Sequence, residues 1–237
     1  AYFKRIFSAY LLSKKTGNLS FWHTPLKANE LTAEDLKTAR RYPMNFEDKL
    51  KFNGSFDGEG VPLLDYKGEL GKRYNPNAVA QYALGFYEKY LDHGESGHRA
   101  SFLKQADWFL RAGRELSDDV VLWEYNFDFE NRQPLKNPWK SALAQGQAVS
   151  VLLRAYKETK EGKYLSRAKK GFNAFRHDMY DHPGGVVSFR GDDVWLEEFV
   201  LNPPNHVLNG FVWALWGVRD YSVMLDDPYA NDLYARA

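Results

Sequence analysis

Two neighbouring carboxylates lie in the segment DVWLEEFVLNPPNHVLNG, where Glu197 and Glu198 follow Trp195. Adjacent side chains in an extended segment point to opposite sides, so we expect at most one carboxylate to face inward, and we assign this position to Glu198. A carboxylate held among aromatic rings has a raised pKa and suits a general base. A solvated acidic pair is the alternative interpretation.

His206 and Asn209 follow in the same segment, where Asn205 is a candidate N-cap for a helix. On that helix His206 and Asn209 would share a face and bind a ligand carboxylate or hydroxyl group. A purely structural histidine is the alternative.

A second polar group lies in SALAQGQAVSVLLRAY, where Gln145 and Gln147 flank Gly146 between apolar residues. Glycine inside a helix costs about 1 kcal/mol relative to alanine, so close approach of a ligand or of another helix is expected there. The two amides suit sugar hydroxyls, and Arg154 lies two turns further on as a candidate carboxylate clamp. A solvated position at the helix end is the alternative for Arg154.

Aromatic residues make up 16% of the chain, which is a high share. Most of them fit a core, but Tyr74, Trp139 and Trp195 stand among polar residues, where a ring can stack on a sugar. Together with the buried polar side chains, these three aromatic residues indicate a solvated pocket in a helical core.

The 237 residues give less support to nucleic-acid binding, membrane spanning, thiol chemistry and metal binding. A net charge of +1 gives no general attraction to nucleic acid or an anionic membrane, and no stretch reads as a membrane span. There is no cysteine, so disulfide and thiol chemistry are excluded and the compartment stays unassigned. Asp128, Glu130, Asp192 and Asp193 match no EF-hand or zinc pattern, so we assign no metal site, with a structural calcium ion as a weak alternative.

Helical periodicity recurs in pairs at a spacing of about 60 residues. The expected helices are Asn77 to Leu91 with Arg99 to Arg114, Lys140 to Thr159 with Tyr164 to His177, and Asn205 to Leu225 with a partner that starts at Asp227-Pro228. Earlier helices are expected at Tyr2 to Ser13 and Thr32 to Tyr42, the latter capped by Thr32 and Asp35. The last helix has only about three turns before Ala237, so we expect the chain to end inside a helical repeat.

Strand character lies between the helix pairs, at Val120 to Phe129 and in a hairpin from Gly184 around Arg190-Gly191-Asp192. We therefore expect an all-α fold: an incomplete α/α toroid of helical hairpins with short β-hairpin connections. Residues 75–237 would form the toroid. Residues 1–74 would add a loop-rich N-terminal segment, with five glycines between Asn53 and Tyr74, that packs on the toroid as part of one structural unit.

Three blocks of the chain resemble the C-terminal domain of the D-glucuronyl C5-epimerase family. They are GVPLLDYKGELGKRYNPNAVAQYALGFYEKYL, WKSALAQGQAVSVLLRAY and WLEEFVLNPPNHVLNGFVWALWGVRDY. The resemblance implies inversion at C5 of a uronic acid residue within an acidic, heparan sulfate-like polysaccharide, without nucleotide or redox cofactor. It places Glu198 on a family glutamate, whereas Phe199 stands where the family commonly has tyrosine.

The candidate site therefore consists of Glu198 as catalytic base and a set of substrate-binding residues. These are Tyr74, Gln81, Trp139, Gln145, Gln147, Arg154, Trp195, His206 and Asn209. Two other functions remain open: a non-catalytic module that binds acidic glycans, and a polysaccharide lyase or glycoside hydrolase on a similar toroid. We also expect a second copy of the chain to cover the open toroid, where Val212, Leu215 and Val218 present apolar surface.

Overall fold

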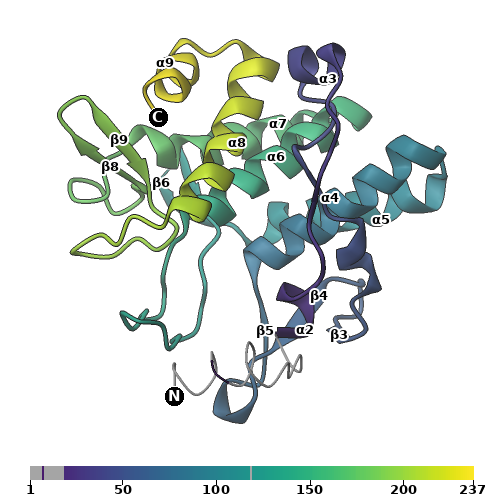
Figure 1. The fold of residues 1–237 in the computed structure, drawn as a ribbon, viewed down its shortest axis with the longest axis horizontal. Helices are drawn as coiled ribbons and strands as arrows, with labels where there is room; N and C mark the ends of the chain where they lie inside the picture. Colours follow the sequence, from purple (N-terminus) through teal and green to yellow (C-terminus); the bar gives the residue numbers. More distant parts are fainter. Residues whose placement is uncertain (1–6, 8–18, 118) are drawn as a thin grey trace.

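The structure is a computed structural model that describes residue 7 and residues 19–117 and 119–237, and the structural statements below concern these residues. Most of the secondary structure is helical, with a minority of short strands (Figure 1). Apart from residue 7, the helix expected from Tyr2 to Ser13 lies outside the described residues. The expectation of an all-α fold is thus correct in its main feature, but four small antiparallel sheets accompany the helices.

Three helical hairpins build the main body, as the paired periodicity predicts. They are α4 (Pro76–His93) with α5 (Ser96–Ala112), α6 (Ala142–Thr159) with α7 (Gly162–Phe172), and α8 (Leu208–Leu225) with α9 (Pro228–Arg236). Side chains of Asn75, Ser141 and Asp227 cap the helices that follow them, each accepting a backbone hydrogen bond. The short 3₁₀ helix η3 (Asn173–Arg176) follows α7 and takes up the rest of the expected helix.

The first helices of the three hairpins lie side by side, with α6 between α4 and α8. Helices α6 and α8 run in the same direction, because Gly146 near the start of α6 contacts Ala214 of α8, and Arg154 further along pairs with Asp220. The N-termini of these inner helices therefore point to one end of the molecule (Figure 1). An incomplete toroid stays a prediction, since three hairpins alone do not define a ring.

The N-terminal segment runs across the inner helices rather than beside them (Figure 1). Tyr42 packs edge-on against Trp216 of α8, Phe46 packs against Trp213, and the Phe46 carbonyl lies against Gly85 of α4. The elements of this segment are α2 (Leu19–Trp22), β1 (Lys27–Ala28), α3 (Ala33–Thr38), β2 (Met44–Asn45) and η1 (Glu47–Lys51). Thr32 and Asp35 form the predicted capping box of α3, which ends before the expected Tyr42 because Ala39 is left-handed, with φ of 48°.

The stretch expected to be loop-rich between Asn53 and Tyr74 forms a three-stranded antiparallel sheet. Its elements are β3 (Ser55–Phe56), β4 (Pro62–Asp65), η2 (Gly68–Leu70) and β5 (Lys72–Tyr74), with β4 in the centre. Gly60, Gly68 and Gly71 have positive φ and make the turns between these short strands. Glycines in this stretch therefore mark tight turns rather than one long loop.

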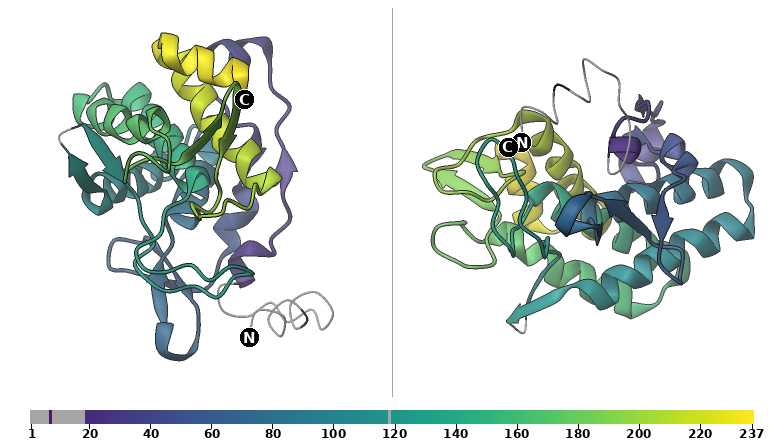
Figure 2. Two further views of the ribbon diagram at one scale, coloured as in Figure 1. Left: turned by 90° about the vertical axis from the view of Figure 1, so that its left-hand side faces the viewer. Right: turned by 90° about the horizontal axis from the view of Figure 1, so that it is seen from below.

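Two β-hairpins connect the helical hairpins. Strand β6 (Arg114–Ser117) pairs with β7 (Val120–Leu122), and β8 (Val187–Arg190) pairs with β9 (Asp193–Leu196) across the predicted turn at Gly191. After β7, bridges between Tyr125 and Trp139 and between Phe129 and Leu135 hold residues 123–139 in a long excursion. This excursion extends from the same end of the molecule as the N-terminus of α8 (Figures 1 and 2).

Helix α8 begins later than expected, at Leu208 instead of Asn205. His206 has a left-handed backbone with φ of 49°, and Val207 is the N-cap, so the expected cap at Asn205 is wrong. On the apolar face of α8, Val218 is fully buried, whereas Val212 and Leu215 are half-buried against the main core. The N-terminal segment packs on α8 at Trp213 and Trp216, and a second copy over Val212, Leu215 and Val218 stays a prediction.

Candidate functional site

Glu198 lies between the first turns of two inner helices. The preceding carbonyl, of Glu197, accepts a hydrogen bond of 2.8 Å from the backbone N–H of Ala142 at the start of α6. On the other side the Glu198 side chain lies against Gly210 in the first turn of α8, where a Cβ would come within 2.3 Å of Oε2. Gly210 therefore provides the space that this carboxylate occupies.

The environment of the Glu198 carboxyl group favours its neutral form. Its Oε2 atom is buried and has no hydrogen-bond partner among the described residues. Burial raises the pKa of Glu198 to about 7, because the charged form loses its hydration. A carboxylate with this pKa can accept a proton near neutral pH, as a general base must.

Tyr125 faces the same region from the excursion between β7 and α6. Its ring stacks on Trp139, with centroids 3.6 Å apart and planes 6° from parallel, and Phe199 packs against Trp139 at 6.0 Å. Burial raises the pKa of Tyr125 well above its ordinary value, nearby Tyr66 and Glu198 raise it further, and a backbone hydrogen bond from Asn77 opposes them. The Tyr125 hydroxyl therefore stays protonated and lies within electrostatic reach of Glu198.

The region around Glu198 and Tyr125 is surrounded by helix N-termini. Asn77 lies in the first turn of α4, Ala142 begins α6, and Gly210 lies in the first turn of α8. A helix N-terminus carries free N–H groups and about half a positive charge. Three such ends at one place favour an anionic ligand.

Glu197 turns away from Glu198 and binds His206. Its side chain is fully buried, with Oε1 2.7 Å from Nδ1 of His206, and the backbone N–H of His206 donates to Oε2 at 3.3 Å. Burial raises the pKa of Glu197, and His206 opposes this shift. Both adjacent carboxylates are therefore withdrawn from solvent on different sides, and the solvated pair is excluded.

Gln145 binds other parts of the chain, and Gln147 does so through its amide nitrogen, while its Oε1 atom has no hydrogen-bond partner among the described residues. Gln145 donates to the carbonyls of Val121 at 2.7 Å and Gly171 at 2.8 Å and accepts from the N–H of Trp123, while Gln147 donates to the hydroxyl of Tyr42 at 3.3 Å. Both amides are buried. Gly146 between them touches Ala214, so its close neighbour is helix α8 and not a ligand.

Arg154 forms a buried ion pair, not a solvated helix end. Its Nη1 lies 2.5 Å from Oδ2 of Asp220, and both side chains are 0% exposed. The same nitrogen donates to the carbonyl of Ser150, and Nε donates to that of Arg40. In this structure Arg154 joins α6, α8 and the N-terminal segment and presents no surface to a substrate.

The other sequence-predicted residues do not form one cluster. Gln81 is buried on α4 and donates to Asn77, with its Oε1 unpartnered. Trp195 packs edge-on against His206, and Asn209 is exposed in the first turn of α8. Since His206 precedes the helix, the shared helical face expected for His206 and Asn209 is wrong. Tyr74 is exposed at the end of β5.

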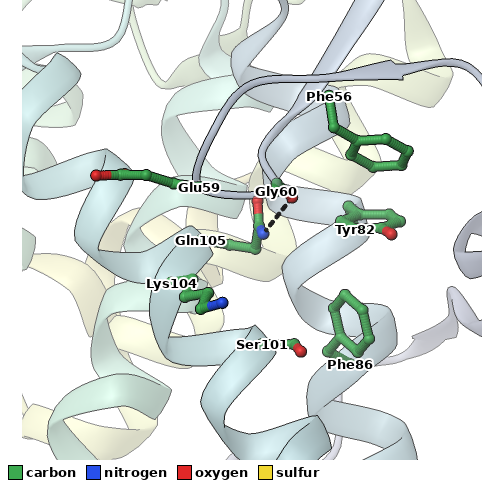
Figure 3. A pocket seen from close by; sticks show the side chains of 8 residues that line it. All are labelled: Phe56, Glu59, Gly60, Tyr82, Phe86, Ser101, Lys104 and Gln105. Carbon is green, nitrogen blue, oxygen red and sulfur yellow. Dashed lines mark hydrogen bonds between the residues drawn. The ribbon is translucent and has the colours of Figure 1, made fainter.

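The surface hollows of the described part include the following three. One of about 440 Å³ includes Trp195 and His206, and one of about 300 Å³ includes Tyr74 and Trp108. The third, of about 260 Å³, lies between α4 and α5, with Phe56, Tyr82 and Phe86 on one wall and Lys104 on the other (Figure 3). None of the sequence-predicted site residues lines the third hollow.

The described residues offer neither a metal cluster nor a helix suited to a membrane. No group of three or more His, Cys, Asp or Glu side chains there is placed to hold a metal ion. Asp128, one of the weak calcium candidates, instead binds Lys136 at 2.7 Å and accepts the N–H of Asn137. None of the helices described is both long and apolar enough to cross a bilayer.

Sequence reasoning missed Tyr125 and the Glu197–His206 pair. The alternating aromatic and polar residues of VVLWEYNFDF identify an extended segment but not which ring comes within electrostatic reach of Glu198. That proximity depends on the bridge between Tyr125 and Trp139, which places the ring at the start of α6.

Comparison with known proteins agrees with the resemblance. The chain is 35% identical to a D-glucuronyl C5-epimerase of Caenorhabditis elegans over 143 residues, which are 59% of this chain and 22% of that protein. It is 31% identical to an uncharacterised protein of Methanocaldococcus jannaschii over 139 residues, 56% of this chain and 43% of the relative. The matched region thus spans less than half the length of either relative. The family described as D-glucuronyl C5-epimerase C-terminus matches residues 117–237, and the chain belongs to this family.

Proposed function

We propose that this chain carries the proton-abstracting half of a uronic acid C5-epimerase that acts on glucuronate residues in a polysaccharide. The observation that carries the proposal is Glu198: a carboxyl group with a pKa of about 7 and an unpartnered buried oxygen, set between the first turns of α6 and α8. Family membership supports the reaction class.

In the proposed reaction, the Glu198 carboxylate takes the proton from C5, and the C–H electron pair moves into the adjacent carboxylate as an enediolate. The helix N-termini around the site stabilise this added charge. A proton returned to C5 from the opposite face completes the inversion. No redox cofactor is needed, because C5 has the same oxidation state before and after.

Tyr125 is the proposed source of the returning proton. Phe199 has no exchangeable proton, whereas the buried Tyr125 hydroxyl is held protonated close to Glu198. When Tyr125 gives its proton to C5, the resulting phenolate is short-lived because burial disfavours its charge, and it recovers a proton from solvent.

Incubation with an unsulfated glucuronate-containing polymer in D₂O tests this function. The wild-type chain should place deuterium at C5, as seen by NMR, and Glu198→Gln should reduce the rate about 100-fold or more. Glu115→Gln, which removes an exposed carboxylate paired with Arg167, is the matched control and should exchange normally. Polymer binding without any exchange by the wild type would contradict catalysis.

A glycan-binding module without catalysis is the second candidate, favoured by Phe199 at the family's tyrosine position. In that case Glu198→Gln should leave affinity for the polymer nearly unchanged while wild type and variant both fail to exchange. The lyase alternative is separated by ultraviolet absorbance, because β-elimination after removal of the same proton leaves an unsaturated sugar.

A further inference from the structure

A second cleft, of about 300 Å³, lies where the start of α4, the end of α5 and the strand after β7 meet. Its volume is at the lower end of small-molecule sites, which hold roughly 300–1,000 Å³. Its walls combine one exposed aromatic ring, Tyr74, and the buried rings behind it with polar side chains. The lining residues used below are Arg73, Tyr74, Trp108, Glu124, Asn126 and Phe127.

An aromatic platform forms one wall of this cleft. Tyr74 is 41% exposed, and its ring lies 5.4 Å from that of Trp108 at an angle of 44°. The Tyr74 hydroxyl donates to Asp57 at 2.8 Å, which fixes the ring in place. An exposed, immobilised ring of this kind suits the apolar face of a sugar.

Arg73 is the cation available to a ligand in the cleft. It is exposed, and no ion pair or hydrogen bond of its side chain is found among the described residues. Glu124 is occupied by a two-pronged contact with Arg114, at 2.6 and 2.8 Å. The Asp57 carboxylate accepts the backbone N–H groups of Glu59 and Val61 besides Tyr74. The local carboxylates are therefore satisfied, and Arg73 can bind an anion.

The cleft is connected to the region around Glu198 by a continuous aromatic layer. Phe127 lines the cleft and packs against Tyr66 at 4.7 Å and Trp139 at 6.1 Å. Trp139 in turn stacks on Tyr125. The cleft and the region around Glu198 therefore share the excursion of residues 123–139 as a common wall.

We propose that the Arg73–Tyr74–Trp108 cleft is a second binding site for an acidic sugar residue of the polymer, with Arg73 on the carboxylate and Tyr74 against the ring. This inference rests on the substrate class of the proposed function but not on its chemistry. Asn126, an exposed amide on the same wall, supplies a partner for a hydroxyl group.

Calorimetric titration of the full chain with a glucuronate-containing octasaccharide tests the proposal. Arg73→Gln and Tyr74→Ala should each weaken binding about fivefold to thirtyfold. Tyr74→Phe, which keeps the ring and loses only the contact with Asp57, should stay within about threefold of wild type. Lys104→Gln is the matched control, because it removes one equally exposed positive charge from the other hollow (Figure 3).

Wild-type affinity in both Arg73→Gln and Tyr74→Ala, or no binding of the octasaccharide by the wild type, overturns the inference. An equal loss in Lys104→Gln also overturns it, since the attraction would then be non-specific. Deuterium exchange on a tetrasaccharide separates the two proposals. If binding depends on Arg73 but no exchange occurs, only the catalytic function is contradicted. If exchange occurs but binding does not depend on Arg73, only the second binding site is contradicted.

Discussion

At the scale of single residues, the chemistry depends on one carboxyl group whose surroundings change its acidity. Glu198 and Glu197 are neighbours in sequence, yet one lies against a glycine with a free oxygen and the other is bound to a histidine. Oε2 of Glu198 has neither a hydrogen bond nor an ion pair among the described residues and can accept a proton.

The pH dependence of C5 exchange follows from this environment. We expect the rate to rise about tenfold per pH unit below pH 7 and to level off above it, because Glu198 with a pKa of about 7 must be deprotonated to act as base. The measurement is deuterium incorporation between pH 5 and 9. A profile already flat from pH 5 upward would show that a carboxylate with an ordinary pKa, or another group, is the base.

Glu198 should also lower stability above neutral pH. Its pKa is raised on folding from 4.5 to about 7, so the folded chain binds more protons between these values and its stability falls as pH rises through them. Glu198→Gln copies the protonated form, so the variant should be more stable than wild type at pH 8 by about 1–3 kcal/mol. Urea denaturation should show this difference at pH 8 and little difference at pH 4.

At the scale of secondary-structure elements, α6 and α8 hold the site because they approach very closely and share a buried charge pair. Gly146 and Gly217 face each other at the crossing, where a Cβ on Gly217 would come within 2.4 Å of Gly146. The Glu198 segment lies at the N-terminal end of this pair. Any shift between the helices therefore moves the carboxylate relative to Tyr125.

Gly146→Ala should destabilise the chain by about 1–3 kcal/mol, because the added methyl group would lie 2.7 Å from the Ala214 carbonyl oxygen. The matched control is Gly97→Ala on α5, where nothing lies within 4 Å of the added Cβ. The control should be neutral or slightly stabilising. Equal effects of the two substitutions on the denaturation midpoint would contradict close packing of α6 on α8.

Arg154→Met should cost about 3–5 kcal/mol in unfolding free energy, because it leaves the buried Asp220 carboxylate with the more distant Arg219 guanidinium, at 3.9 Å, as its remaining countercharge. The double variant with Asp220→Leu should cost less than the sum of the two single substitutions, since no charge is then left buried. A double-mutant cycle by urea denaturation gives this coupling. Additive single effects would show that the pair does not interact.

At the scale of the whole molecule, the N-terminal segment is part of the body that holds the site. Tyr42 and Phe46 are buried against tryptophans of α8, and Lys49 donates to the Phe21 carbonyl at 2.7 Å. Burial lowers the pKa of Lys49 to about 8, so this contact also joins α2 to η1 through a desolvated amine. The segment covers Trp213 and Trp216 of α8 with its own aromatic rings.

We expect residues 19–74 and 75–237 to unfold together in one cooperative transition, because large aromatic contacts join them. Calorimetry and tryptophan fluorescence should give coincident midpoints. Two separate transitions, with the N-terminal segment lost first, would mean that it packs on the helical hairpins as a detachable unit. Deletion of this segment should expose Trp213 and Trp216 and promote association.

The sequence by itself determined the helix pairs, the hairpin at Gly191, the capping box at Thr32 and the family, because these depend on local periodicity, turn residues and motif order. It also identified the inward polar residues. Only the tertiary structure decided which groups surround those residues. Gln145 donates to the backbone of a distant segment, and Arg154 pairs with an aspartate. Glu198 lies against a glycine and within electrostatic reach of a tyrosine. The physical reason is that a buried polar group needs a partner, and the same pattern results whether a ligand or a remote segment of the chain provides it.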